Sequence, residues 1–552
     1  MKTLFDAFIS YGRADSKAFA TNLHKRLLEE GFKVWFDQND IPLGVDFQNQ
    51  IDDGIEQSHN FLFIIAPHSV KSPYCLKEIE LAVKRHKRII PLLHVEPNDC
   101  WDKMHPTIGK INWVYFREEQ DNFDQSFAGL VSLIRKHADY VEQHTRFLVK
   151  ALAWERNQKQ TRYLLIGEER VQAESWLKVR FKNEQPPCIP TDLHCEYICE
   201  STKNANNLLT QVFLAYSDKD RAVLEKIGKS LMREGFTIWT NRTDIRTGTQ
   251  FQTEIDRGIE GADNVIYLIS PDSIQSKYCQ DELTHALAHK KRIIPLLIEP
   301  TNLEEIPLQI QGLQFIDFTQ YSDEESYHIS VDKLLNQLKQ DAYYYEQHKV
   351  LLVKALKWFR QNRNPSILLR GYNLQHAEAW LKVARQRQEH PPLPLHEEFI
   401  GESLSQPTDS SVEVFISYSR ADSDFARKLN EALQIQGKTT WFDQESIASG
   451  TDFQQEIYRG IENSDNFLFI ISPRSVNSPY CSDEVEYAQK LNKRFVTVLH
   501  RDVEPIELHP ALAKVQWIDF NRHDGDLYAN FSELVRTLDT DREHVRYHTK
   551  WS

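Results

Sequence analysis

The sequence is poor in the residues that build flexible linkers, and it has no long apolar segment. Glycine and proline number only 19 and 22 among 552 residues, so no long flexible linker is expected. No apolar run approaches the roughly 20 residues that a membrane-spanning helix needs. Residues 1–6 lead straight into a strand instead of forming a signal peptide. We therefore expect no membrane partner, and we predict a cytoplasmic protein.

The sequence also lacks a surplus of positive charge and an even set of cysteines. The net charge of −14 argues against a general nucleic-acid binder, because neutralising phosphates requires excess Lys and Arg. Seven cysteines are an odd count, and three of them (Cys75, Cys279 and Cys481) recur at one repeat position. Reduced thiols are typical of the cytosol. No G-x-x-x-x-G-K-[ST] loop occurs, so no NTPase site is expected.

What is present is one long segment repeated three times, at residues 5–138, 211–341 and 412–540. The three copies open with FDAFISYGRAD, QVFLAYSDKD and EVFISYSRAD. Later they read NFLFIIAPHSVKSPYCLKEIELA, NVIYLISPDSIQSKYCQDELTHA and NFLFIISPRSVNSPYCSDEVEYA. A period of about 200 residues indicates repeated domains and not a solenoid of small units.

Each repeat alternates short apolar runs with amphipathic stretches. In the first repeat the runs predict strands at 7–9, 34–36, 61–65, 89–93 and 113–116. Helical spacing covers residues near 16–30, 46–57, 72–86 and 123–138. Buried strands separated by helices predict an α/β fold with a parallel five-stranded, flavodoxin-like sheet. Ligands of such sheets bind beyond the carboxyl ends of the strands.

Two related helical connectors separate the repeats, and each is expected to form a two-helix hairpin ending at Pro186-Pro187 or Pro391-Pro392. The last residues match only the start of such a connector, so a further module is expected beyond it. The predicted organisation is three domains at 1–138, 209–342 and 411–541, connectors at 139–208 and 343–410, and a truncated third connector at 542–552.

The FISY opening, the W-F-D segment before a Gly-containing loop, and the S-P-Y-C-x-x-E motif together resemble the Toll/interleukin receptor (TIR) domain family. In that family some domains only assemble with other TIR domains, while others cleave NAD+. The connectors resemble those that join TIR domains to sensor modules in bacterial proteins. The resemblance thus implies an NAD+ glycohydrolase in prokaryotic defence or stress signalling, with NAD+ as substrate and no cofactor.

A glutamate in the S-P-Y-C-x-x-E motif is the candidate catalytic group. Ser72 and Pro73 are typical of a helix start, which places Glu78 in the second turn. Glu78, Glu282 and Glu484 match the catalytic glutamate of TIR enzymes. One carboxylate suffices for this chemistry, because cationic nicotinamide leaves neutral and needs no proton. The carboxylate then has only to stabilise an oxocarbenium-like ribose. A solvated helix glutamate is the alternative.

Further positions are predicted to contact the substrate. Tyr74, Tyr278 and Tyr480 precede the glutamate by one helical turn, where an aromatic ring can stack on a base or lie half-buried. Arg13 and Arg420 could bind the pyrophosphate or simply be surface arginines. The complete predicted substrate site is Ser10, Tyr11, Arg13, Asp37, Tyr74, Ser417, Tyr418, Arg420, Asp443 and Tyr480.

The middle repeat departs from this pattern. It has Asp218 where the others have Arg13 and Arg420, and Thr240-Asn241 where the others have Phe-Asp. An anion facing a pyrophosphate is repulsive. We therefore predict that the middle repeat, with Glu282, is catalytically weak and serves mainly in packing.

The loops after the second strand resemble the assembly loop of the family, which implies TIR–TIR contacts in cis or in trans. Their marker residues are Ile41, Gly44, Ile245, Gly248, Ile447 and Gly450. Tethering raises the mutual concentration of the three domains.

No metal site is expected, because Cys188, Cys195 and Cys199 with His194 fit no zinc spacing. Two alternative functions stay open. One is an adaptor that signals by TIR–TIR contact alone, and the other is a related nucleoside-processing enzyme.

Overall fold

A computed structural model describes residues 4–36, 47–160, 163–165, 167–182, 184–205, 209–240, 251–406, 412–442, 452–521 and 530–540. The chain forms two compact units. One holds the first repeat and most of the first connector, and the other holds most of the second repeat, the second connector and the third repeat. Among the described residues, no helix combines the length and apolar character needed to cross a membrane.

The first repeat forms the predicted parallel sheet. Its strands are β1 (Phe5–Ser10), β2 (Val34–Trp35), β3 (Ser58–Ile65), β4 (Arg88–Leu93) and β5 (Val114–Tyr115). Its helices are α1 (Arg13–Glu29), α3 (Phe47–Gln57), α4 (Pro67–Lys71), α5 (Pro73–Lys84) and α6 (Phe123–Arg135). The strand order β2-β1-β3-β4-β5 is flavodoxin-like. The short helix α4 was not expected from the sequence.

The second and third repeats have the same topology, with strand orders β10-β9-β8-β6-β7 and β12-β11-β13-β14-β15. The second contains β6 (Thr210–Ala215), β7 (Ile238–Trp239), β8 (Ala262–Ile269), β9 (Arg292–Leu297), β10 (Ile316–Asp317), α10 (Arg221–Arg233), α12 (Phe251–Glu260), α13 (Pro271–Gln275), α14 (Lys277–Ala288), α15 (Leu308–Gln311) and α16 (Glu324–Lys339). The third contains β11 (Val412–Ser417), β12 (Thr440–Trp441), β13 (Ser464–Ile471), β14 (Arg494–Leu499), β15 (Ile518–Asp519), α20 (Ser423–Ile435), α21 (Asp452–Glu462), α22 (Pro473–Val476), α23 (Pro479–Lys490) and α24 (Phe531–Asp539).

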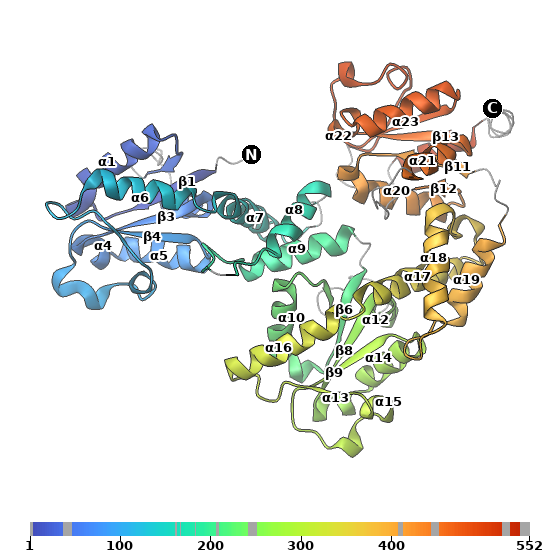
Figure 1. Ribbon diagram of the computed structural model, residues 1–552, viewed down its shortest axis with the longest axis horizontal. Helices are drawn as coiled ribbons and strands as arrows, with labels where there is room; N and C mark the ends of the chain where they lie inside the picture. The colour runs from blue at the N-terminus through green and yellow to red at the C-terminus, as the bar shows by residue number, and fades with distance from the viewer. Residues whose placement is uncertain are drawn as a thin grey trace. The chain divides into compact units, whose positions relative to one another are not determined.

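Helices cover both faces of each sheet, which explains the near-continuous apolar strands. In the second repeat α10 and α16 lie on one face, and α12 and α14 lie on the other (Figure 1). Successive residues of β8 therefore enter two different cores: Ile266 and Leu268 pack under α10 and α16, while Val265 and Tyr267 pack under α12 and α14. The predicted α/β architecture with three five-stranded parallel sheets is confirmed.

A close contact in the first repeat gives a stability prediction. Trp35 stacks on Phe8 with ring centroids 4.5 Å apart, and a Cβ added to Gly54 would lie 2.7 Å from the Trp35 ring. Gly54→Ala is therefore expected to lower the free energy of unfolding of this domain by about 2 kcal/mol. Gly129→Ala in α6, where a Cβ meets nothing within 4 Å, should be neutral or stabilising. Equal unfolding midpoints in urea for the two variants would contradict the predicted clash.

Within its described residues each connector contains three α-helices, so the predicted two-helix hairpin is wrong. The first connector comprises α7 (Ala138–Arg156), α8 (Gly167–Leu177) and α9 (Asp192–Ala205). The second comprises α17 (Ala342–Arg360), α18 (Gly371–Ala384) and α19 (Pro394–Leu404). The connector does not end at the proline pair, because a third helix follows it. This helix buries Tyr197 and Ile198 in the first connector and Phe399 and Ile400 in the second.

The first helix of each connector is held to the preceding repeat by a repeated ion pair. Arg156 of α7 lies 2.7 Å from Glu56, which is at the end of α3. Arg360 of α17 binds both carboxyl oxygens of Glu260, at the end of α12, at 2.7 and 2.9 Å. Each glutamate is nearly inaccessible to solvent. The contact orders the connector helix against its own domain.

Candidate active site

In the first repeat, the candidate catalytic glutamate meets the end of the first strand. Ser10, the last residue of β1, donates its hydroxyl to Oε2 of Glu78 at 2.6 Å. Glu78 is half-buried in the second turn of α5, as its spacing from Ser72 predicted. The sheet topology thus brings together two residues 68 positions apart, at the carboxyl edge where parallel sheets bind ligands.

The third repeat reproduces this geometry. Ser417, the last residue of β11, donates to Oε2 of Glu484 at 2.6 Å, and Glu484 is likewise half-buried on α23. A hydroxyl donated to a carboxylate fixes its orientation and favours its ionised form. Each of these two sites therefore presents one oriented, partly accessible carboxylate.

The second repeat lacks the serine. Ala215 ends β6 at the equivalent position, and Glu282 is only 4% exposed. Its Oε2 makes no hydrogen bond within the described residues. Burial, with a smaller contribution from the charge of Asp281, raises the pKa of Glu282 to about 8. At neutral pH this carboxyl is therefore mostly protonated, unlike the oriented carboxylate that the chemistry needs.

The helix that carries the glutamate starts as the sequence predicts. Ser72, Ser276 and Ser478 are the N-caps of α5, α14 and α23, and each accepts from the backbone N–H of the cysteine three residues on. Those cysteines are buried in the cores. Burial raises the pKa of each thiol to about 12. They are packing residues, because a nucleophilic cysteine needs a lowered pKa.

A family model described as the TIR domain matches residues 7–131, 212–335 and 414–535, which is more than half of the chain. The chain belongs to the TIR domain family. Each match falls on one of the three parallel sheets and includes its serine or alanine and its glutamate.

Curated relatives match one TIR domain at a time. The chain is 31% identical over 108 residues to the 2′ cyclic ADP-D-ribose synthase BtTIR of Bacteroides thetaiotaomicron, a match that spans 19% of this chain and 38% of that protein. It is 31% identical over 134 residues to Toll-like receptor 13 of Mus musculus, across 22% of this chain and 13% of the receptor. The chain therefore covers well under two thirds of either relative.

A solved structure is also similar, the TIR domain of the Toll-related receptor TRR-2 from Hydra magnipapillata. The identity is 24%, the match covers 24% of this chain and 98% of that one, and the TM-score is 0.21.

The tyrosines one turn before the glutamates lie at the surface of their TIR domains. Tyr74, Tyr278 and Tyr480 are 58%, 65% and 72% exposed, so the half-buried alternative does not describe them. Their exposed rings lie on the helix that carries the glutamate, and their contact with a substrate stays a prediction.

After the first strand of the first and third TIR domains, the predicted tyrosine is largely buried, whereas the predicted arginine is exposed. Tyr11 is buried and stacks on Phe36 at 5.4 Å, and Tyr418 is half-buried and stacks on Phe442 at 5.2 Å. Arg13, the first residue of α1, and Arg420 have exposed side chains.

Eight predicted residues fall outside the described residues. They are the two aspartates Asp37 and Asp443, and the loop positions Ile41, Gly44, Ile245, Gly248, Ile447 and Gly450. Their roles stay predictions.

An aspartate that the sequence analysis did not single out joins the segment after the first strand of each TIR domain to the segment after the third strand. In the first TIR domain Asp15 accepts the backbone N–H of His68 at 2.7 Å. In the others, Asp220 and Asp422 accept a hydroxyl from the serine that caps α13 or α22, at 2.8 and 2.5 Å. The signal was available, because all three opening motifs have aspartate at this position.

Proposed function

We propose that this protein cleaves the nicotinamide–ribose bond of NAD+, with the first and third TIR domains as its catalytic units. The observation that carries the proposal is the hydroxyl–carboxylate pair of Ser10 with Glu78, which Ser417 and Glu484 repeat. Two domains about 400 residues apart thus keep one geometry at the edge where parallel sheets bind ligands. The names of similar TIR proteins, among them a 2′ cyclic ADP-D-ribose synthase, support the same chemistry.

The proposed mechanism uses the carboxylate as a fixed negative charge. As the glycosidic bond breaks, positive charge moves from nicotinamide to the ribose, and neutral nicotinamide departs. Glu78 or Glu484 stabilises the developing oxocarbenium ion and holds a ribose hydroxyl. The serine hydroxyl keeps the carboxylate in one rotamer, so little reorganisation is needed at the transition state. Water or a hydroxyl of the substrate then completes the reaction.

The second TIR domain is proposed to contribute little turnover. Its carboxyl has no serine donor, and the pKa of Glu282 near 8 leaves it neutral at physiological pH. A neutral carboxyl cannot supply the charge stabilisation described above. This argument is independent of Asp218, the substitution that first suggested a weak middle repeat.

The first test is nicotinamide release from NAD+ by the purified full-length chain, at high protein concentration with a crowding agent. Release would support the enzyme. If the protein self-associates but releases no nicotinamide at either high or low protein concentration, the adaptor function is favoured instead. The ratio of cyclic to linear ADP-ribose in the products distinguishes a synthase from a hydrolase.

The two serines give a graded prediction. Ser10→Ala with Ser417→Ala copies the residue that the second TIR domain has naturally, Ala215, so the fold should tolerate it. Loss of a hydrogen bond to a charged group costs about 1.5–3 kcal/mol, which corresponds to a decrease of about 10- to 100-fold in kcat. Steady-state nicotinamide release measures this. An unchanged kcat would show that the hydroxyls do not orient the carboxylates in catalysis.

A further inference from the structure

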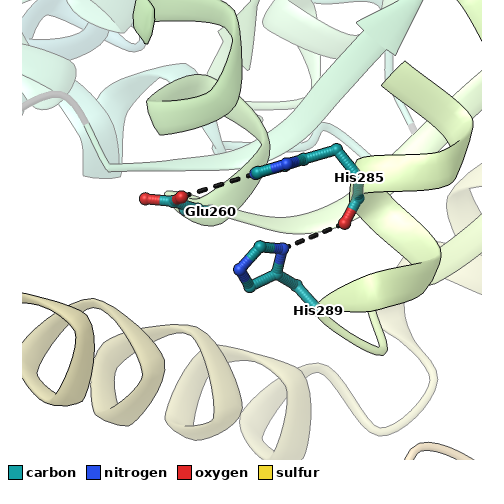
Figure 2. Close-up of side chains that lie close together, drawn as sticks. All are labelled: Glu260, His285 and His289. Atoms are coloured by element: carbon teal, nitrogen blue, oxygen red, sulfur yellow. Dashed lines mark hydrogen bonds and ion pairs between the residues drawn. The ribbon is translucent and has the colours of Figure 1, made fainter. Parts of the chain in front are cut away.

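Two histidines and a buried glutamate meet in the second TIR domain, outside the proposed NAD+ site. Glu260 ends α12, and His285 and His289 lie one turn apart at the end of α14 (Figure 2). One ligand atom from each of the three residues lies within 4.8 Å of the others. Within the described part of the chain, no other group of three His, Cys, Asp or Glu residues meets this criterion.

The surroundings of the two rings show which ring nitrogens already have a partner and which do not. Nδ1 of His285 lies 3.8 Å from Asp256, and Nδ1 of His289 lies 3.0 Å from the backbone carbonyl of His285. Nε2 of His285 is buried, 3.4 Å from Oε1 of Glu260, and makes no hydrogen bond within the described residues. A histidine that binds a metal ion usually has its second nitrogen held by a carboxylate or a carbonyl, as Nδ1 of His289 is here.

The other TIR domains keep the glutamate but not the histidines. In the first, Leu81 and Arg85 occupy the two positions, and the Arg85 guanidinium lies 2.9 Å from Glu56. In the third, the positions hold Tyr487 and Leu491, and the Tyr487 hydroxyl donates to the equivalent glutamate. In all three domains, a residue of the helix that carries the candidate catalytic glutamate thus contacts the buried glutamate at the end of α3, α12 or α21. Only the second domain supplies a pair of imidazoles.

We propose that Glu260, His285 and His289 bind one divalent transition metal ion of the zinc class. Imidazole and carboxylate ligands suit Zn²⁺, and three protein ligands with water in the remaining position form a complete coordination set. The ion would join α12 to α14 beside the contact that α17 makes with this domain.

Arg360 is the competing cation, because its guanidinium binds both oxygens of Glu260. A carboxylate has about four lone-pair sites, so two remain for a metal ion. The nearby positive charge nevertheless repels the ion. Arg360→Gln should therefore tighten metal binding, whereas loss of either imidazole should weaken it.

The test uses the untagged full-length chain, stripped with a chelator and titrated with Zn²⁺ by calorimetry. We expect one equivalent to bind to this site. His285→Leu copies Leu81 of the first domain, and His289→Leu copies Leu491 of the third, so both changes are to residues that this fold accepts. Each should weaken binding at least about 100-fold. Far-UV circular dichroism in chelator checks that the variants stay folded.

A spectroscopic arm separates this site from the buried cysteines. Co²⁺ bound by imidazole and carboxylate should give visible ligand-field bands without the intense near-ultraviolet bands of a thiolate complex. Wild-type protein and the Arg360→Gln variant should both give this spectrum. Absence of saturable binding, undiminished binding in both leucine variants, or a thiolate spectrum would each overturn the proposal.

Discussion

A chain carrying Glu78→Gln together with Glu484→Gln is expected to lose more than about 1000-fold of its nicotinamide release. Glutamine keeps the size and the hydrogen-bonding reach of the side chain but removes its charge. Losing one oriented donor in an active site already costs about 100- to 1000-fold, and here the whole stabilising charge is removed. The Ser10 and Ser417 hydroxyls would then face a neutral amide.

The single variants divide the activity between the two domains. In the Glu78→Gln variant only the turnover of the third domain should remain. In the Glu484→Gln variant only the turnover of the first domain should remain. Adding Glu282→Gln to the double variant should change little, because the second domain is proposed to be nearly inactive. Light scattering at the assay concentration controls for altered self-association. A double variant that keeps a tenth of the wild-type rate would remove these glutamates from the mechanism.

Local features of this chain were predictable from the sequence. The strand positions of the first repeat, the parallel five-stranded sheets and the helix start at Ser72 are confirmed, because patterns among near neighbours in the sequence indicate each of them. The third helix of each connector, α9 or α19, was not predicted, because the local sequence pattern does not indicate it. Its apolar face is short, and the preceding proline pair is a strong local break. Burial of its apolar residues stabilises it in the folded protein.

Features that depend on distant residues were not predictable. The sequence shows Ser10 and Glu78 as separate candidates, and the hydrogen bond between them arises only when β1 and α5 meet at the sheet edge. For the same reason, the sequence alone does not show that Ala215, where the other two domains have serine, removes the hydroxyl that binds the glutamate in those domains. The three residues at the end of α12 and α14 likewise come together only in the folded domain.

The burial of Glu282 leads to a second large effect, on stability. Its pKa of about 8 in the folded domain is far above the ordinary value of about 4.3 for an exposed glutamate. The folded state therefore holds a proton that the unfolded state releases between these two values. The contribution of Glu282 to the free energy of unfolding is fully present below pH 4. Between pH 4 and pH 8 this contribution decreases by about 1.4 kcal/mol per pH unit.

Glu282→Gln should remove this dependence, because the amide stays neutral at every pH. Scanning calorimetry of the full-length chain from pH 5 to 9 should show the second TIR domain unfolding at a higher temperature in the variant. The gain should grow with pH and reach several kcal/mol near pH 9. Glu80→Gln, an exposed change on α5, corrects for the loss of one negative charge. A gain that is independent of pH would mean that Glu282 is ionised in the folded domain.

Ala215→Ser tests whether the missing hydroxyl causes the unusual state of Glu282. The new side chain has a precedent in Ser10 and Ser417, which are equally buried at the same strand end. A donated hydroxyl favours the ionised carboxyl, so the pH dependence of unfolding should flatten. In the background of the Glu78 and Glu484 variants, the same change should also raise nicotinamide release. A flattened profile without release would leave Asp218, which replaces the arginine of the other two domains, as the reason for low activity. An unchanged profile would mean that burial alone sets the protonation of Glu282.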